Sequence, residues 1–504
     1  MTRQSISTKP SVAGISRRKL LGLGVGSAGA LALGSTLPGA LRRARAESAA
    51  DARFLFILTA TGGASIIDSL LPVAHSEISS PERVAALTAY PDEAIASPPG
   101  SGFRCVRNLS DRFTALPFGS DFDPVDFVSR RKDDMLVMTL DNTSVNHDVA
   151  QQRSMNGDGV DRGRTIAEAM AMTYGFEQPL ANCMMSSGGF TQAGIWDEVP
   201  DEARAVLIGD PWQLALATHG SRGLAGVPSV DDVARARHTC ELLDEHSAFG
   251  RRYGHSEARE RFLALRGGAS AELEGADLVD TLMLLEQTPE RPLSALGLSP
   301  SPELERLRER LPKLGEDRLH AQAALAFLLA REGASSVVTF GPGFIPPIDS
   351  DGRAFGTPLA FDFSHTNHLV SQNVMWCRMF EVLDGLIGLL QSEPLGDGSM
   401  WDQSLIYVAT DFGRTKVIPE GGSFFNFSSG HDLNNGSLLL SPRLRGNRVY
   451  GGVDPETCLT YGFDPRTGEP EPGRLMGAPH LYSLIAQALE IDFPGRLDMS
   501  GLLR

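Results

Sequence analysis

The sequence predicts an α/β protein: a three-layer sandwich in which a mainly parallel central sheet is covered by helices on both faces. Three observations lead to this prediction. Short runs of consecutive apolar residues are typical of strands buried on both faces. Helical patterns lie between these runs, and alternating strands and helices are typical of a parallel sheet. The length of 504 residues is ample for a large core, and the hydrophobic content of 42% is ordinary for a globular protein.

Five apolar runs are expected to form the buried strands of this sheet. They lie at residues 54–58, 135–140, 337–340, 405–409 and, as a shorter candidate, 438–440. Runs that are apolar throughout are expected in a parallel sheet that is covered by helices on both faces.

Helices are expected in the segments between the strands. Residues 317–331 place apolar side chains near one face, and Gly333 follows as a stop signal. From about 368 to 390 apolar residues recur every three or four positions, which is most simply a core-facing stripe. Residues 232–265 and 271–287 are rich in Ala, Arg, Glu and Leu and are also expected to be helical.

The remaining segments organise the chain around the sheet. Residues of about 225–315 hold helical patterns without a strong strand, and we expect them to form a helical insertion or cap. Residues 90–104, 341–360 and 416–437 are rich in Gly, Pro, Ser and Asn and are expected to be long loops. Long loops at strand ends are where such folds usually carry their sites.

The first 46 residues have the pattern of an export signal. Arg17 and Arg18 are adjacent, a weakly apolar, glycine-rich stretch follows from Leu20 to about Leu41, and Ala44-Arg45-Ala46 supplies small residues for cleavage. This pattern predicts a cleaved twin-arginine signal, with the twin-arginine translocation machinery as partner and residues 47–504 in the periplasm or outside the cell. A transmembrane anchor is the alternative, but the glycines make the stretch a poor bilayer span, so we expect no stable transmembrane segment after cleavage.

Charge and cysteine content exclude several classes of protein. The chain has a net charge of −16, and residues 1–46 carry eight basic and no acidic residues, so residues 47–504 are eight charges more negative, at −24. Such a surface argues against nucleic acid as a partner. The five cysteines are scattered without a C-x-x-C pair, which argues against a disulfide framework, a zinc ribbon, an iron–sulfur site or a haem attachment site. We therefore expect no organic cofactor.

Polar clusters follow the apolar runs. After the first run comes Thr61-Gly62-Gly63-Ala64-Ser65, in which adjacent glycines let the backbone turn sharply and Ser65 is a candidate catalytic hydroxyl, although a plain strand-to-helix turn explains the same residues. After the second run come seven polar residues in eight, with His147 among them. Asp411 directly follows the run at 405–409, and Arg414 lies three residues later.

Two further clusters contain metal-ligating residue types. Asp362 and His365 precede the long helix expected from about 368, and His431 lies in the loop before the run at 438–440. Together with Asp411 they form a series of Asp and His residues that could meet at the carboxyl edge of a parallel sheet and hold zinc, calcium or manganese. The alternative is that Ser364 or Thr366 caps the helix and the histidines are merely exposed.

The order of these motifs resembles that of the bacterial proteins grouped as domain of unknown function 1501, a branch similar to the alkaline phosphatase superfamily, which also holds sulfatases. The resemblance spans roughly residues 54–490 and is sharpest at 403–454, in Gly413-Arg414-Thr415 and Tyr450-Gly451-Gly452-Val453-Asp454. It implies an alkaline-phosphatase-like sandwich with a metal site at the carboxyl edge of the sheet. Asp362 and His365 resemble the first ligand pair, Asp411 the acidic residue at a later strand exit, His431 the last histidine ligand, and His147 the histidine after the second strand.

The sequence thus predicts an exported, metal-dependent hydrolase acting on a small anionic substrate, a phosphate or sulfate ester. Asp362, His365, Asp411 and His431 would hold the metal, and the catalytic candidates are Ser65, His147 and Arg414. Arg414 could neutralise the substrate anion or form a structural ion pair. A non-catalytic cell-envelope or ligand-binding protein that retains the hydrolase fold is the alternative, because Gly430-His431-Asp432 places the histidine before the aspartate, the reverse of the family's order.

Overall fold

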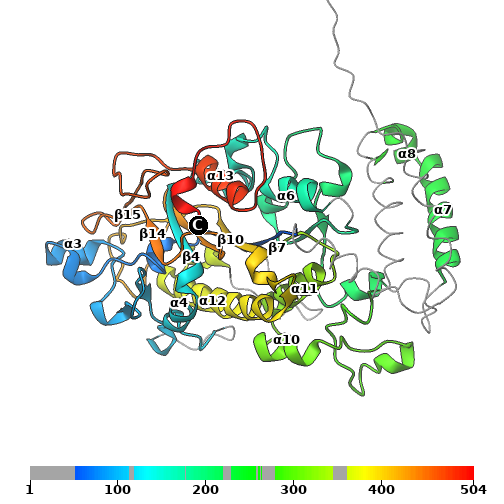
Figure 1. Cartoon of the computed structure of the whole chain (residues 1–504), viewed down its shortest axis with the longest axis horizontal. Coiled ribbons are helices and arrows are strands. Elements are labelled where there is room, and N and C mark those ends of the chain that lie inside the picture. Colours follow the sequence, from blue (N-terminus) through cyan, green and yellow to red (C-terminus); the bar gives the residue numbers. More distant parts are fainter. Residues whose placement is uncertain are drawn as a thin grey trace, which may run out of the picture.

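An eight-stranded sheet runs through the centre of the protein (Figure 1). The structure is a computed structural model that describes residues 52–112, 119–175, 178–218, 229–256, 259–260, 263, 278–343 and 360–504. The expected leader, residues 1–46, lies outside these described residues. Across the sheet the strands follow in the order β14 (Arg448–Tyr450), β4 (Met135–Asp141), β13 (Asn434–Leu440), β10 (Ser404–Thr410), β1 (Phe54–Ala60), β7 (Val337–Phe340), β5 (Asn182–Met185) and β6 (Val206–Leu207).

The sheet is mixed but mostly parallel. Strand β13 runs antiparallel to its neighbours β4 and β10, and every other neighbouring pair in this sheet is parallel. The predicted α/β class with a mainly parallel central sheet is therefore confirmed, and all five predicted apolar runs lie in strands. The prediction missed β5, β6 and β14, which are too short to show a clear sequence pattern.

The direction of β13 decides which edge of the sheet its flanking loop reaches. Asn434, the first residue of β13, pairs with Asp141, the last residue of β4. The residues just before β13 therefore lie at the edge where β4, β10 and β1 end. Because His431 precedes β13 by only three residues, the antiparallel strand brings it to the carboxyl edge of the parallel strands.

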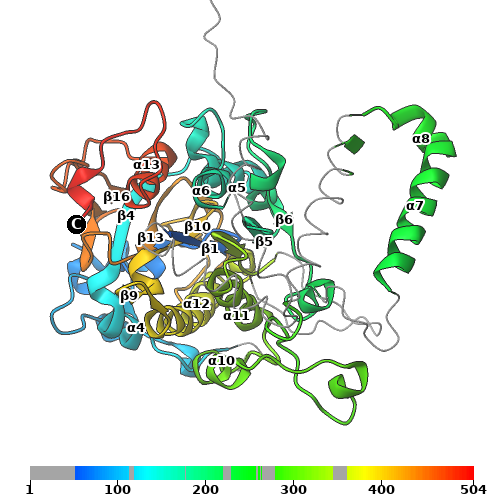
Figure 2. The ribbon, with the colours of Figure 1, turned by 45° about the vertical axis from the view of Figure 1, so that its right-hand side comes forward.

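Helices cover both faces of the sheet (Figures 1 and 2). In β1 successive side chains point to opposite faces, so that Phe56 belongs to one hydrophobic core and Ile57 to the other. This double burial explains why the strands are continuously apolar. The core that contains Phe56 is shared with α11 (Arg318–Arg331) and α12 (His368–Ser392), and the core that contains Ile57 with α6 (Ile166–Tyr174) and α13 (Ala478–Ala488).

The helices predicted at 317–331 and at about 368–390 are confirmed as α11 and α12. Asp317 caps α11 by accepting a hydrogen bond from the N–H of Leu319. The cap of α12 is Asn367, whose side chain accepts from the N–H of Val370, rather than Ser364 or Thr366. This cap fixes the start of α12 immediately after the turn that carries Asp362 and His365.

The region expected as a helical insertion contains α7 (Val230–His246), α8 (Ala248–Tyr253) and α10 (Leu304–Arg310). In the described part of 232–265 the predicted helical segment is divided between α7 and α8, because Ser247 takes extended backbone angles and its hydroxyl caps the new helix α8. Residues 278–287 are not helical, and 271–277 lie outside the described residues. Figure 2 shows α7 and α8 standing beside the layered body rather than on a face of its sheet.

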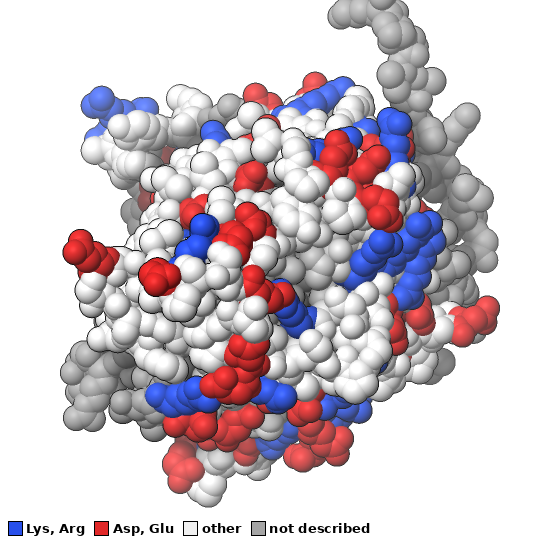
Figure 3. All heavy atoms as spheres, turned by 90° about the vertical axis from the view of Figure 1, so that its left-hand side faces the viewer, with Lys and Arg blue, Asp and Glu red and all other residues white. Residues whose placement is uncertain are grey.

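On the face shown in Figure 3, acidic and basic side chains are interspersed, so the negative net charge does not gather into one patch there.

Most of the predicted loop 341–360 lies outside the described residues. Across the ranges that the structure describes, no helix is both long and apolar enough to cross a membrane.

Candidate metal centre

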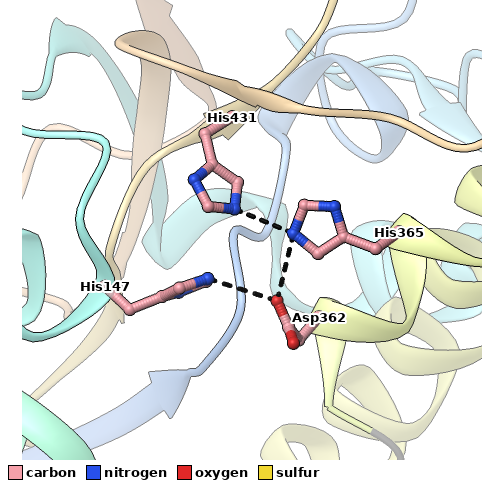
Figure 4. Close-up of side chains that lie close together, drawn as sticks. All are labelled: His147, Asp362, His365 and His431. Carbon is pink, nitrogen blue, oxygen red and sulfur yellow. Dashed lines mark hydrogen bonds and ion pairs between the residues drawn. The ribbon is translucent and has the colours of Figure 1, made fainter.

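Four side chains converge beyond the carboxyl edge of the sheet (Figure 4). His147 is the first residue of α5 (His147–Asn156), Asp362 and His365 lie in the short 3-10 helix η12 (Phe361–His365), and His431 lies in β12 (His431–Asp432). One potential ligand atom from each residue lies within 4.8 Å of those from the others. These four residues, which we call the ligand group, could hold a metal ion.

The distances inside the ligand group are short. The Nε2 atoms of His365 and His431 lie 2.8 Å apart. Oδ1 of Asp362 lies 3.2 Å from Nε2 of His147 and 3.5 Å from Nε2 of His365. All three imidazoles therefore point the same ring atom, Nε2, towards one space that the Asp362 carboxylate also reaches.

Partners outside the ligand group orient each imidazole. Nδ1 of His147 lies 2.7 Å from the Asp411 carboxylate, and Nδ1 of His431 lies 2.7 Å from the carbonyl oxygen of Val145. The His365 ring is hydrogen-bonded to the backbone of Ser429. A metal-binding histidine usually donates its second N–H to a carboxylate or carbonyl, which fixes the tautomer and leaves the other nitrogen free to bind the ion. The ligand group shows this pattern at His147 and His431.

Phe412 provides an apolar wall behind two of these rings. It is fully buried, its ring stacks on His431 at 4.1 Å between centroids, and it lies 4.7 Å from the His147 ring. Such packing restricts the ring rotation of both histidines and excludes water from that side of the group.

The structure places Asp411 behind His147 rather than in the ligand group, which differs from the predicted set of ligands. Asp411 directly follows β10 and is fully buried. Its carboxylate accepts hydrogen bonds from the backbone N–H groups of Gly62 and Gly63 and from the side chain of Gln151. With the contact to His147, both carboxylate oxygens are occupied, so this residue anchors the histidine instead of reaching the central space.

The turn after β1 requires its paired glycines, because another backbone segment passes close to it. Gly62 and Gly63 have φ angles of +95° and +82°, which favour glycine. A Cβ atom on Gly62 would lie 2.1 Å from the backbone nitrogen of Asp362. The turn therefore serves both to hold Asp411 and to let the segment carrying Asp362 pass close by.

Two of the predicted catalytic residues are buried behind the group. Ser65 is fully buried; its N–H donates to Gln372 and its carbonyl accepts from Trp376, so these contacts tie it to α12 and not to the ligand group. Arg414, in β11 (Gly413–Arg414), is also fully buried. Its guanidinium lies 3.4 Å from Asp362 and 3.2 Å from Nε2 of His365.

The guanidinium of Arg414 also donates hydrogen bonds to backbone carbonyls. It donates to the carbonyl of Gly62 and, at 3.4 Å, to the carbonyl of Ser429. The buried guanidinium therefore crosslinks the glycine turn, η12 and the loop before His431. Of the two roles considered for Arg414, this geometry matches the structural ion pair.

The electrostatics of the group set its charge state. Burial lowers the pKa of both His365 and His431, which favours the neutral form of both rings. The hydrogen bond with His147 lowers the pKa of Asp362. Burial would lower the pKa of His147, but its hydrogen bonds with Asp362 and Asp411 outweigh that effect and raise it to about 9. Without a metal, His147 is therefore a cation between two carboxylates.

His147 was predicted as a catalytic residue, and the structure makes it a member of the ligand group. The polar run after β4 was the sequence signal for its position. In the structure Asn146 caps α5 by accepting a hydrogen bond from the N–H of Val149. Val145, Gln151 and Ser429 were not predicted, because backbone carbonyls and isolated polar residues carry no recognisable motif. Comparison of the sequence with protein-family models and with curated proteins gives no match.

Proposed function

We propose that this protein is a metal-dependent hydrolase of phosphate or sulfate esters. One observation carries the proposal: three imidazoles and one carboxylate point ligand atoms into one space within 4.8 Å of one another, and the outward nitrogens of His147 and His431 already have partners. His147 and His431 are half-buried and His365 is exposed. Three imidazoles held this close lose hydration where they face one another, and a bound ion would compensate for that loss.

The chemistry of the donors favours some metals over others. Three imidazole nitrogens and one carboxylate oxygen suit zinc, and also manganese, because both accept nitrogen ligands. Calcium prefers six to eight oxygen ligands, and the ligand group offers oxygen only from Asp362. Of the three ions expected from the sequence, we therefore propose zinc first and calcium last.

A bound divalent ion would polarise an ester oxygen and lower the pKa of a hydroxyl or water. Residues of the chain would hold this ion and orient its ligands. Asp362, His365 and His431 would hold the ion together with His147, and Asp411 would keep the proton of His147 on Nδ1. Arg414 adds positive charge beside Asp362, which would favour the binding of an anionic ester at the adjacent centre.

An assay of ester hydrolysis tests this proposal. The purified protein is stripped of metal, supplied again with zinc or manganese, and offered aryl phosphates and aryl sulfates. We expect hydrolysis only after metal is restored, and its loss in His365→Ala. His255→Ala is the matched control, because His255 is exposed and lies outside the ligand group. Hydrolysis that persists in His365→Ala, or that occurs equally without added metal, would contradict the proposal.

A second candidate function is metal binding without catalysis. The burial of Ser65 and Arg414 favours it, because neither of these predicted catalytic residues presents a free side chain to a substrate. The same assay separates the two functions. Stoichiometric metal binding with no turnover of any ester supports the non-catalytic protein, whereas metal-dependent turnover supports the hydrolase.

We also propose export by the twin-arginine pathway, on the basis of Arg17 and Arg18 in the leader. Replacing both residues by lysine should leave uncleaved precursor inside the cell. Fractionation of the native host checks this, and normal delivery of the double-lysine variant to the periplasm or medium would contradict it.

A further inference from the structure

A second chain of buried polar side chains lies behind the ligand group. The hydroxyl of Tyr90 donates to Oδ1 of Asp68 at 2.8 Å, and Nε2 of His368 lies 3.1 Å from the same oxygen. On its other side, Nδ1 of His368 lies 2.9 Å from the hydroxyl oxygen of Ser429. All four residues are at most 2% exposed. We call this series, from Tyr90 to Ser429, the buried relay.

The buried relay stabilises a carboxylate in the protein interior. Burial alone would raise the pKa of Asp68, yet its contacts with His368, Ser65 and Tyr90 outweigh this and lower it. A charged carboxylate without such partners would strongly destabilise the folded state at this depth. The arrangement therefore depends on His368 remaining in place between Asp68 and Ser429.

The buried relay ends at the backbone that supports two metal ligands. The carbonyl of Ser429 accepts from Arg414, the His365 ring is hydrogen-bonded to the Ser429 backbone, and the N–H of Ser429 donates to the carbonyl of Ser364 at 3.0 Å. Ser429 is also only two residues before His431. Its position therefore affects both the ring that it contacts and the residue that follows it.

His368 joins the same loop in two more ways. Its backbone N–H donates to the carbonyl of Phe427 at 2.9 Å, and its ring packs on the Phe427 ring with 4.8 Å between centroids. Since His368 is the first residue of α12, three residues after His365, it connects the segment that carries Asp362 and His365 to the loop that carries His431.

We infer that Asp68, His368 and Ser429 are positioning residues, which hold His365 and His431 in place for a bound metal. This inference rests on the metal centre of the proposed function. Asp411 orients His147 directly, and Asp68 acts one step further away, through His368 and Ser429.

The order Ser–His–Asp also occurs in nucleophilic triads, in which the histidine activates the serine. That role needs a serine that a substrate can reach. Ser429 is 2% exposed and its hydroxyl also approaches the carbonyl of Ser364, at 3.5 Å. The geometry therefore matches a support for the loop and not a second nucleophile.

Metal binding by selected variants tests the inference. Ser429→Ala removes one hydroxyl at the end of the buried relay. His368→Asn keeps a polar atom near Nδ1 and loses the contact with Asp68, whereas His368→Gln reaches towards Asp68 and loses Ser429. His320→Gln is the matched control, because His320 is 1% exposed in α11 and is not among the residues of the ligand group.

Three measurements are made on each protein: the zinc dissociation constant by competition with a chelator, the visible absorption of the cobalt-substituted protein, and the urea midpoint of the metal-free protein. Ser429→Ala and both His368 variants should bind zinc roughly 10- to 100-fold more weakly and shift the cobalt bands, as loss of an outer partner does. His320→Gln should lower the urea midpoint without either change.

The outcomes separate this inference from the function on which it rests. Unchanged zinc affinity and cobalt spectra in Ser429→Ala and both His368 variants would overturn the positioning role while leaving the metal centre intact. Equal weakening in His320→Gln would show that the effect is only general destabilisation and would overturn it as well. A wild-type protein that binds neither zinc nor cobalt would overturn both the inference and the proposed function.

Discussion

Nδ1 of His147 lies 2.7 Å from Oδ2 of Asp411, although the two residues are 264 positions apart in the chain. Asp411 leaves the end of β10, and His147 begins α5 beyond the end of β4. The contact turns Nε2 of His147 towards Asp362 and joins two strand exits into one polar group.

Replacing Asp411 by asparagine should weaken metal binding without removing a ligand. The amide is a poorer acceptor for the Nδ1 proton of His147, so the ring is no longer held in the tautomer that offers Nε2. We expect a metal affinity lower by roughly 10- to 100-fold, as for other outer-partner substitutions. Titration calorimetry measures it. Asp141→Asn, at the end of β4 but outside the ligand group, is the control and should bind as the wild type does.

Gly62→Ala should damage the protein more than an ordinary glycine substitution. At Gly421, with φ of +79° and open space around it, alanine should cost about 1–2 kcal/mol of unfolding free energy from backbone strain. At Gly62 the new methyl group would also meet the backbone of Asp362, which raises the cost to about 3 kcal/mol or more. Urea unfolding of the metal-free Gly62→Ala and Gly421→Ala variants measures the unfolding free energy that each one loses. Equal losses would argue against a close approach of the Asp362 backbone to Gly62.

Metal affinity should depend on pH through His147. Its pKa of about 9 means that it carries a proton at neutral pH, and binding of a metal must displace this proton. Between pH 7 and 9 the affinity should therefore rise by about tenfold per pH unit, with about one proton released per ion. Calorimetry in buffers of different ionisation enthalpy counts this proton. An affinity that is flat over this range would show that His147 does not bind the ion.

The free energy of unfolding of the metal-free protein should fall as the pH rises, whereas the metal affinity should rise. The pKa of His147 is raised from 6.5 to about 9 on folding, so its charged form stabilises the folded state. This contribution is fully present below pH 6.5 and is lost as the pH rises to about 9. Urea midpoints of the wild type should fall across that interval more steeply than those of His147→Gln. Parallel curves for the two proteins would contradict the assignment.

Arg414→Met tests whether the buried arginine is a structural crosslink. The substitution removes the ion pair between Arg414 and Asp362 and leaves the carbonyls of Gly62 and Ser429 without this buried donor, which should cost about 2–4 kcal/mol of unfolding free energy. Arg235→Met breaks an exposed ion pair with Asp232 and should cost less than about 1 kcal/mol. If Arg414 served only to bind a substrate, the two variants would be similarly stable.

Much of the fold could be predicted from the sequence because buried parallel strands are continuously apolar. The runs around Ile57, Val137 and Val408 stood out for this reason. The direction of β13 could not be predicted, since an apolar run is the same in either direction. The break at Ser247 was missed because its serine cap lies within a segment of strong helix formers.

The candidate site was predicted in part. Asp362, His365 and His431 were expected to meet, and they do, although His431 reaches the group only because β13 is antiparallel. Asp411 was predicted as a metal ligand and His147 as a catalytic residue, whereas the structure places His147 in the ligand group and Asp411 behind it. A carboxylate that binds a metal and one that orients a histidine occupy similar sequence positions, and only the two glycine N–H groups that hold Asp411 separate the cases.

The most direct test of the metal centre is the metal content of protein purified from its native host and dialysed, measured by mass spectrometry. We predict one zinc or manganese ion per chain in the wild type, and its loss in a His365→Ala/His431→Ala double variant that remains folded by circular dichroism. A wild-type protein without metal, or a double variant that retains as much metal as the wild type, would contradict the account.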